Sequence, residues 1–227
     1  MKRLEKIRFS HVGELSRVCC VSDESLKERN IHPETGRFLS RNDKETLLGQ
    51  RGVVLWMYGL SGSGKSTIAN LLERKLHGEG RFTAILDGDN LRAGLNANLG
   101  FSDEDRAENV RRVAETAKLL AGFGVIVLVS VITPRRELRD LASRIIGEDF
   151  HEVYVRAAFE TCAGRDPKGL YAKAREGSLK QFTGKDSGFE EPQNGCLTLD
   201  TEASSAEECA LLLRDYLGRI KDSGGLA

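Results

Sequence analysis

The chain has 227 residues, and its 34 lysines and arginines balance its 34 aspartates and glutamates, so the formal net charge is zero and no overall field favours nucleic acid or an anionic membrane. Its 40% hydrophobic and 30% charged residues are typical of a folded globular domain rather than of a disordered chain. With neither the apolar core of a secretory signal near Met1 nor an apolar run long enough to cross a bilayer, we expect a cytoplasmic protein with no membrane or nucleic-acid partner.

Apolar patterning predicts strands that alternate with helices. A continuous apolar run at 53–58 indicates a buried parallel strand, and an apolar stripe from Ile68 to Leu76 indicates a helix that stops near Gly78. The other predicted strands are 82–86, 125–132, 152–156 and 196–200. The other predicted helices run from a Ser102 cap to Ala121, from a Thr133 cap with Pro134 to Gly147, and from Ala206 to Ile220. This order predicts an α/β fold of the P-loop type, a mostly parallel sheet with helices on both faces and ligands at the carboxyl ends of the strands.

The sequence GLSGSGKST has the G-x-x-x-x-G-K-S spacing of a phosphate-binding loop, between a predicted strand and a predicted helix. We expect its backbone N–H groups to surround phosphates, the Lys65 ammonium to reach the β and γ oxygens, and the Ser66 hydroxyl to bind Mg²⁺. The loop predicts nucleoside triphosphate binding but does not separate a kinase from a GTPase or an ATPase. The predicted ATP-binding residues of the loop are Gly59, Leu60, Ser61, Gly62, Ser63, Gly64, Lys65, Ser66 and Thr67.

Charged residues follow the second predicted strand in the sequence LDGDNLRAGL. A carboxylate such as Asp87 or Asp89 can orient and deprotonate an acceptor hydroxyl or hold Mg²⁺ through water, and Arg92 can fix an anionic acceptor. Without the phosphate-binding loop, a D-G turn with solvated charges would explain these residues equally well.

Two further stretches indicate a second ligand. In LGFSDEDRAENVRR, Arg106 and Asn109 share a helix face, and Phe101 can stack on a base. Spacing alone slightly favours the alternative, a solvated helix face on which Phe101 is a hydrophobic staple. Residues 159–192 lose clear periodicity and are rich in Lys and Arg, which predicts a mobile basic lid over a polyphosphate. Taken alone, such a basic run is more often a solvated surface.

Together with EVYV, RDPKGLYAKAREG, FTG and LTLDT, these motifs resemble the adenylylsulfate kinase family. The resemblance covers about residues 30–201, so we assign 30–227 to one kinase domain and leave 1–29 as an N-terminal extension of unknown role. It implies transfer of the γ-phosphoryl group of ATP, with Mg²⁺, to the 3′-hydroxyl of adenosine 5′-phosphosulfate in sulfate activation. It also implies a homodimer, with a sulfurylase as a candidate partner.

The resemblance implies roles for individual residues. Lys65 and Asp89 are the implied catalytic residues. Asp89 is implied to lie near the 3′-hydroxyl and to bind Mg²⁺ together with Ser66. Arg165 is implied to lie where the lid approaches ATP. Phe101 and Phe182 are implied to hold the adenine between them. The residues implied to bind the acceptor are Asp87, Asp89, Arg92, Phe101, Arg106, Asn109, Ile132, Lys168, Leu170 and Phe182.

One residue departs from the family pattern. Family members commonly have Ser-Pro after the third strand, with the serine described as a phosphorylated intermediate, whereas this chain has Thr133-Pro134. Direct in-line transfer needs no protein nucleophile, so we assign Thr133 to helix capping and to the wall of the site.

Three alternatives to the implied activity were considered. A kinase of gluconate, shikimate or nucleosides would leave the pair Phe101 and Phe182 unexplained. A regulatory module that binds a nucleotide without turnover is disfavoured by intact Lys65, Ser66 and Asp89, and a signalling GTPase by the lack of an N-K-x-D sequence.

Overall fold

The structure is a computed structural model that describes residues 30–32, 34–176, 188–192 and 195–223. The chain divides into two compact units, 1–39 and 40–227. In the described part of the first unit, a short 3₁₀ helix (η2, Thr35–Arg37) is accompanied by a hydrogen bond from Arg37 to Glu34 of 2.8 Å. The proposed N-terminal extension, 1–29, lies outside the described residues.

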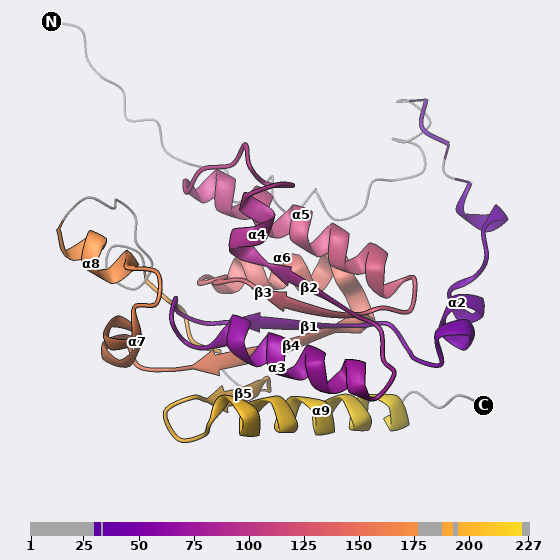
Figure 1. Ribbon diagram of the computed structural model, residues 1–227. Helices are drawn as coiled ribbons and strands as arrows, with labels where there is room; N and C mark the ends of the chain where they lie inside the picture. Colours follow the sequence, from indigo (N-terminus) through magenta and orange to yellow (C-terminus); the bar gives the residue numbers. More distant parts are fainter. Residues whose placement is uncertain (1–29, 33, 177–187, 193–194, 224–227) are drawn as a thin grey trace, which may run out of the picture. The chain divides into compact units, whose positions relative to one another are not determined.

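A five-stranded parallel sheet forms the centre of the second unit (Figure 1). Its strands are β1 (Val53–Tyr58), β2 (Thr83–Asp87), β3 (Ile126–Ser130), β4 (Phe150–Arg156) and β5 (Leu197–Asp200), in the order β2-β3-β1-β4-β5. The central strand β1 is buried at every position, which explains why its sequence is apolar throughout rather than alternating. The predicted bounds of β1 are confirmed, and the other strands differ from prediction at their ends by one or two residues.

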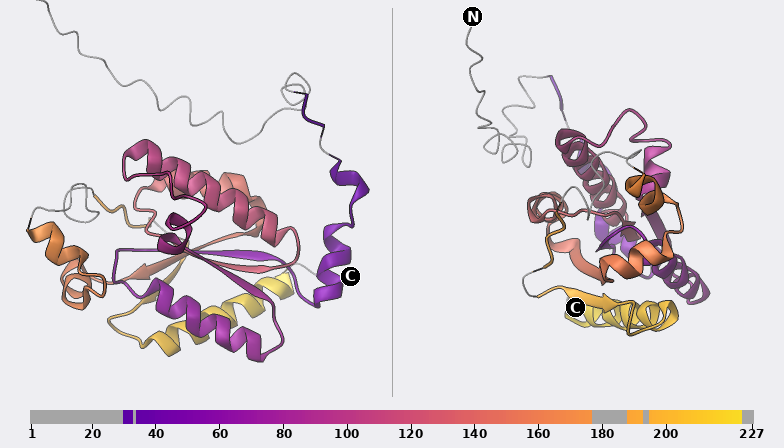
Figure 2. Two further views of the ribbon diagram at one scale, coloured as in Figure 1. Left: turned by 45° about the horizontal axis from the view of Figure 1, so that its top comes forward. Right: turned by 90° about the vertical axis from the view of Figure 1, so that its left-hand side faces the viewer.

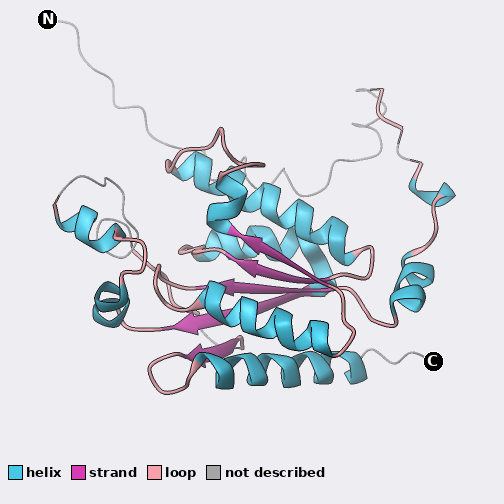
Figure 3. Cartoon of the chain, viewed as in Figure 1, coloured by secondary structure: helices cyan, strands magenta, loops and turns pink. Residues whose placement is uncertain are grey.

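Four long helices cover the two faces of the sheet (Figures 1 and 3). They are α3 (Lys65–Gly78) and α9 (Ala206–Ser223) on one face and α5 (Asp103–Ala121) and α6 (Arg136–Ile146) on the other, an arrangement that Figure 2 shows from two further directions. The predicted stripe on α3 is confirmed, since Ile68 and Leu72 are buried against Leu55 of β1 and Leu213 of α9. The predicted α/β fold is therefore confirmed.

The predicted N-cap is confirmed for α5 and wrong for α6. The Ser102 hydroxyl accepts the backbone N–H of Asp105 at 3.1 Å and caps α5 as predicted. The capping role of Thr133 is wrong, because α6 begins at Arg136 with Arg135 as its N-cap. Thr133 instead adopts a left-handed conformation, with φ of 37°, and its buried hydroxyl accepts a hydrogen bond from the Trp56 indole at 3.1 Å.

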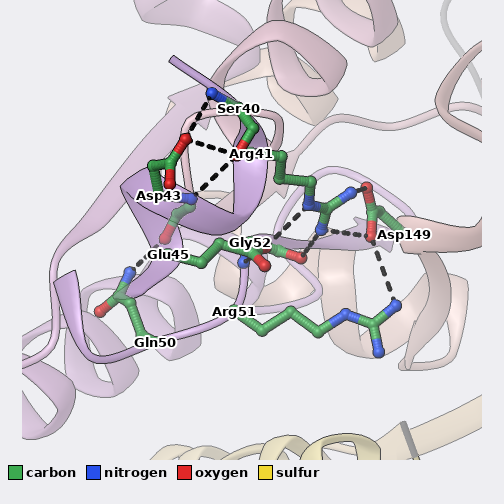
Figure 4. A network of polar contacts seen from close by, with 9 residues as sticks. Ser40, Arg41, Asp43, Glu45, Gln50, Arg51, Gly52 and Asp149 are labelled. Carbon is green, nitrogen blue, oxygen red and sulfur yellow. Dashed lines mark hydrogen bonds and ion pairs between the residues drawn. The ribbon is translucent and has the colours of Figure 1, made fainter. Parts of the chain in front are cut away.

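Within the described residues, four short α-helices were not predicted. They are α2 (Arg41–Leu48), α4 (Gly88–Arg92), α7 (Phe159–Arg165) and α8 (Leu170–Arg175). The signals for α2 were present, since Ser40 and Asp43 form a capping box and Gly49 ends the helix in a left-handed conformation. The guanidinium of Arg41 ties α2 to Asp149 before β4 and to the carbonyl of Gly52, and it also pairs with Glu45 within the helix (Figure 4).

None of the helices within the described ranges has both the length and the apolar character needed to cross a bilayer.

Candidate active site

A cavity of about 1120 Å³ lies at the carboxyl ends of the strands. Its walls come from the loops after β1, β2, β3 and β5, from the start of α5, and from the segment between α7 and α8. The predicted site residues that line it are Ser61, Gly62, Gly64, Lys65, Ser66, Thr67, Asp87, Asp89, Arg92, Phe101, Arg106, Asn109, Ile132, Arg165, Lys168 and Leu170. Gly59, Leu60 and Ser63 belong to the same loop without lining the cavity, and Phe182 lies outside the described residues.

Glycine is required in the loop between β1 and α3 for steric reasons. A Cβ atom at Gly59 would lie 2.3 Å from the carbonyl oxygen of Val155, and Gly64 has a φ of 103° where it caps α3. These positions let the loop turn tightly from strand to helix, so that the N-terminus of α3 faces the cavity. An N-terminus in this position is a binding site for phosphate.

Lys65 is buried inside this loop. Its ammonium donates hydrogen bonds to the carbonyls of Gly59 and Leu60 at 2.9 and 2.8 Å. Burial lowers the pKa of Lys65 to about 8, because the charged form is poorly solvated there. A polyphosphate bound against the loop would supply the negative charge that favours the protonated form.

Ser66 and Asp87 form a hydroxyl–carboxylate pair beside the loop. The Ser66 hydroxyl donates to Asp87 at 2.7 Å and lies 3.1 Å from the Ser130 hydroxyl. Asp87 also caps α4 by accepting the N–H groups of Asp89 and Asn90. Burial opposes ionisation of Asp87, but the hydrogen bonds from Ser66 and from these two N–H groups hold its pKa below the ordinary value.

This pair fits Mg²⁺, which prefers oxygen ligands and keeps several of its waters. A P-loop serine together with an aspartate at the end of a nearby strand is the arrangement that holds Mg²⁺ in P-loop enzymes. The sequence had paired Ser66 with Asp89, and the contact between Ser66 and Asp87 was not predicted. The role of Asp89 as a ligand stays a prediction.

Asp89 meets the segment predicted to be a lid. Its carboxylate forms an ion pair with the Lys168 ammonium, and both side chains line the cavity and are at least half exposed. The fold thus brings together Asp89 and Lys168, two predicted site residues from motifs that lie far apart in the sequence.

Arg92, Phe101 and Arg106 form a second cluster in the cavity. The guanidinium of Arg92 lies over the Phe101 ring, 4.4 Å from its centre, and Arg106 Nε donates to the Phe101 carbonyl at 3.0 Å. The ring is 59% exposed, which does not fit a staple buried against the helix. Burial lowers the pKa of Arg106, and the positive charge of Arg92 lowers it further, so this wall favours an anion.

Asn109 is placed by a residue that the sequence did not suggest. Its side-chain oxygen accepts a hydrogen bond from the buried amide of Asn96 at 3.0 Å. The amide assignment leaves the NH₂ group of Asn109 for the cavity that the residue lines.

The segment after β4 is attached to the phosphate-binding loop. Arg165 donates to the carbonyl of Thr201 at 2.7 Å and to that of Gly62 at 3.4 Å, and the Tyr171 hydroxyl donates to the Ser61 carbonyl at 2.8 Å. Helices α7 and α8 pack together through a small apolar cluster that includes Cys162 and Tyr171. Thr201 and Tyr171 were not predicted as site residues, because their contacts with the loop depend on tertiary structure.

Comparisons with known proteins agree with this geometry. The profile of the adenylylsulphate kinase family matches residues 51–200. The adenylyl-sulfate kinase of Phocaeicola vulgatus is 58% identical over 184 residues, which are 81% of this chain and 90% of the relative.

Two solved structures are also similar. The APS kinase of Mycobacterium tuberculosis, solved in complex with AMPPNP and APS, is 50% identical and has a TM-score of 0.72, over 74% of this chain and 99% of that chain. The hexameric APS kinase of Thiobacillus denitrificans is 25% identical with a TM-score of 0.58, over 87% of this chain and 36% of that chain. With a family match over most of its length and a relative of this identity, the chain belongs to the adenylylsulphate kinase family.

Proposed function

We propose that the chain transfers the γ-phosphoryl group of ATP to the 3′-hydroxyl of adenosine 5′-phosphosulfate. The observation that carries this proposal is one cavity that is lined by a phosphate-binding loop, by an arginine–phenylalanine cluster and by Asp89. The APS kinase of M. tuberculosis supports it, because that protein was solved with both AMPPNP and APS.

The loop with Lys65 forms the donor half of the cavity. Backbone N–H groups and the Lys65 ammonium bind the β and γ phosphates, and positioning with charge neutralisation supplies most of the rate enhancement in such a transfer. Ser66 and Asp87 would hold Mg²⁺, which neutralises charge that develops on the phosphate oxygens. Arg165, which contacts the loop, adds positive charge at its outer edge.

The arginine–phenylalanine cluster forms the acceptor half. Arg92 and Arg106 bind the phosphosulfate, Phe101 covers one face of the adenine, and Phe182 is the predicted second wall. Asp89 accepts the proton of the 3′-hydroxyl as that oxygen bonds to the γ-phosphorus and the bond to ADP breaks. Lys168 neutralises Asp89 until the acceptor arrives.

Direct transfer from ATP to the acceptor requires no phosphorylated protein. Thr133 is 4% exposed, and its hydroxyl is hydrogen-bonded to Trp56. A threonine fixed in this way is suited to forming the wall of the site, and no attacking role follows from its position.

The assembly of the chain is also a proposal. We infer a homodimer, as the family resemblance implies, and light scattering of the full chain would show twice the monomer mass. A docking sulfurylase and a cytoplasmic location stay predictions.

An assay of ADP release tests the proposed activity. We expect adenosine 5′-phosphosulfate to stimulate ADP release in the presence of Mg²⁺, whereas gluconate, shikimate and nucleosides leave the rate at its background level. Lys65→Ala is the matched control for a contaminating kinase, because it should remove the stimulated rate. Stimulation by gluconate or a nucleoside, with none by adenosine 5′-phosphosulfate, would refute the proposal.

A further inference from the structure

Arg139 is a buried charge that the motifs do not explain. It lies on α6 between Leu138 and Leu141 and is 2% exposed, and burial of a guanidinium is costly unless it is paired and hydrogen-bonded. Its Nε lies 3.0 Å from a carboxylate oxygen of Glu152 on β4, and its guanidinium covers the Tyr58 ring at 4.5 Å. These contacts with Glu152 and Tyr58 hold the Arg139 side chain in one position.

The remaining contacts of Arg139 are with the loop between β3 and α6. One guanidinium nitrogen donates to the carbonyls of Thr133 and Pro134, at 3.2 and 3.3 Å. Both of these residues line the cavity, and so does Ile132 before them. Thr133 has a left-handed backbone conformation that β-branched residues rarely adopt, so the loop needs outside contacts to stay in this shape.

A second segment is tied to the same loop. The backbone N–H of Glu190 donates to the Pro134 carbonyl at 2.8 Å, and the Glu190 carboxylate accepts the backbone N–H of Arg136 at 2.7 Å. Phe189 stacks on the Tyr58 ring that Arg139 also contacts, with centroids 6.2 Å apart. Segment 188–192 is therefore held against the loop between β3 and α6 and contacts the same Tyr58 ring as Arg139 does.

We propose that Arg139 is a positioning residue for the acceptor nucleotide. Through the carbonyls of Thr133 and Pro134, its buried guanidinium fixes the wall of the cavity that begins at Ile132. The phosphate-binding loop shares one hydrogen bond with this wall, from the Gly59 N–H to the Ile132 carbonyl at 3.3 Å. It also has supports of its own, because it starts from β1, which is hydrogen-bonded to a strand on each side, and because the Lys65 ammonium donates to the carbonyls of Gly59 and Leu60. Arg139 thus acts mainly on the KM for the acceptor and changes the KM for ATP little, an inference that rests on the proposed function.

Paired substitutions separate positioning from simple stability. Arg139→Met alone leaves the partly buried Glu152 carboxylate without its ionic partner. We therefore compare it with the double variant Arg139→Met/Glu152→Gln, in which both charges are replaced by neutral groups and stability is expected to recover. Arg139→Lys keeps the charge beside Glu152 but lacks the planar fork that reaches the loop carbonyls. Arg144→Met, at an exposed position on the same helix, is the matched control.

Steady-state kinetics and fluorescence of the full chain give the two readouts. We expect the double variant and Arg139→Lys to melt near the wild-type temperature, with the KM for adenosine 5′-phosphosulfate raised at least tenfold and the KM for ATP within twofold. Trp56 is the sole tryptophan of the chain, and its indole is hydrogen-bonded to Thr133 in the loop that Arg139 holds. Because a loosened loop exposes the indole, acrylamide should quench the fluorescence more in both variants than in Arg144→Met.

Recovery of the wild-type acceptor KM in the double variant would overturn the proposal, as would equal increases in both KM values. If the wild-type chain failed to phosphorylate adenosine 5′-phosphosulfate, the proposed function would fall. The quenching of Trp56 in the ligand-free variants would then decide on its own whether Arg139 holds the loop, and unchanged quenching in Arg139→Lys would refute that role.

Discussion

The Lys168 ammonium and the Asp89 carboxylate form an ion pair that joins the segment between α7 and α8 to helix α4, which follows β2. Both side chains are at least half exposed, and an exposed pair contributes little to stability. Substrates can therefore separate the two groups at small cost, which leaves Asp89 to receive a proton and Lys168 to meet negative charge.

Asp89→Asn tests the proposed proton acceptor. Because an amide cannot accept the hydroxyl proton, we expect kcat to fall by about a hundredfold or more, while the Kd for ATP changes little. Asp140→Asn, at an exposed position on α6, is the control and should keep full activity. A variant at position 89 that retains more than about a tenth of kcat would exclude this role.

Asp87→Asn tests the proposed magnesium pair. Asparagine can still cap α4, so the substitution removes the charge beside Ser66 and largely preserves the fold. We expect the free Mg²⁺ concentration for half-maximal activity to rise by about tenfold or more, and chelation of Mg²⁺ to abolish the wild-type activity. An unchanged Mg²⁺ curve would show that another residue, such as Asp89, carries the metal.

The lowered pKa of Lys65 predicts a pH dependence of ATP binding. Because the free protein loses the Lys65 proton near pH 8 and the bound polyphosphate favours the charged form, the Kd for ATP should be flat below about pH 7 and rise above pH 8. Calorimetry in buffers of different ionisation enthalpy should detect proton uptake on binding above pH 8. Lys65→Arg should bind with no such rise, and a flat wild-type profile up to pH 9.5 would contradict the prediction.

The same shift has a consequence for stability. Between about pH 8 and the ordinary lysine pKa, the unfolded chain binds more protons at Lys65 than the folded chain does. The contribution of Lys65 to the free energy of unfolding should therefore increase as the pH rises through this window.

Thr133→Ala distinguishes direct transfer from a phosphorylated intermediate. We expect kcat to stay within about tenfold of the wild-type value, because no step uses the hydroxyl. The lost hydrogen bond to Trp56 should lower the free energy of unfolding by about 1 kcal/mol, measured by urea denaturation. Complete loss of turnover in a folded variant that still binds both substrates would revive the intermediate.

The sequence was informative wherever the signal was local. A strand buried on both faces must be apolar throughout, which located β1, and the glycines of the phosphate-binding loop are required by backbone geometry. The contact between Ser66 and Asp87 joins residues 21 apart and depends on the strand order β2-β3-β1, which the sequence does not state.

Other features were hidden because tertiary contacts stabilise them. Helices α7 and α8 are too short for a periodic signal and pack through Cys162 and Tyr171. Arg139 follows Leu138 on a helix and looks like an ordinary charged residue until Glu152 and the loop carbonyls are seen around it. The capping role predicted for Thr133 was wrong because α6 begins three residues later, at Arg136, whereas the predicted place of Thr133 in the wall of the site agrees with the cavity lining.

The most direct measurement is the position of the transferred phosphate. ATP that carries an isotopic label in its γ-phosphoryl group would be incubated with adenosine 5′-phosphosulfate, Mg²⁺ and the full chain, and the nucleotide product analysed by phosphorus NMR and mass spectrometry. We predict that the label resides on the ribose 3′-oxygen and is absent from the Asp89→Asn reaction above background. Label found only in inorganic phosphate, or on another position of the acceptor, would contradict the account.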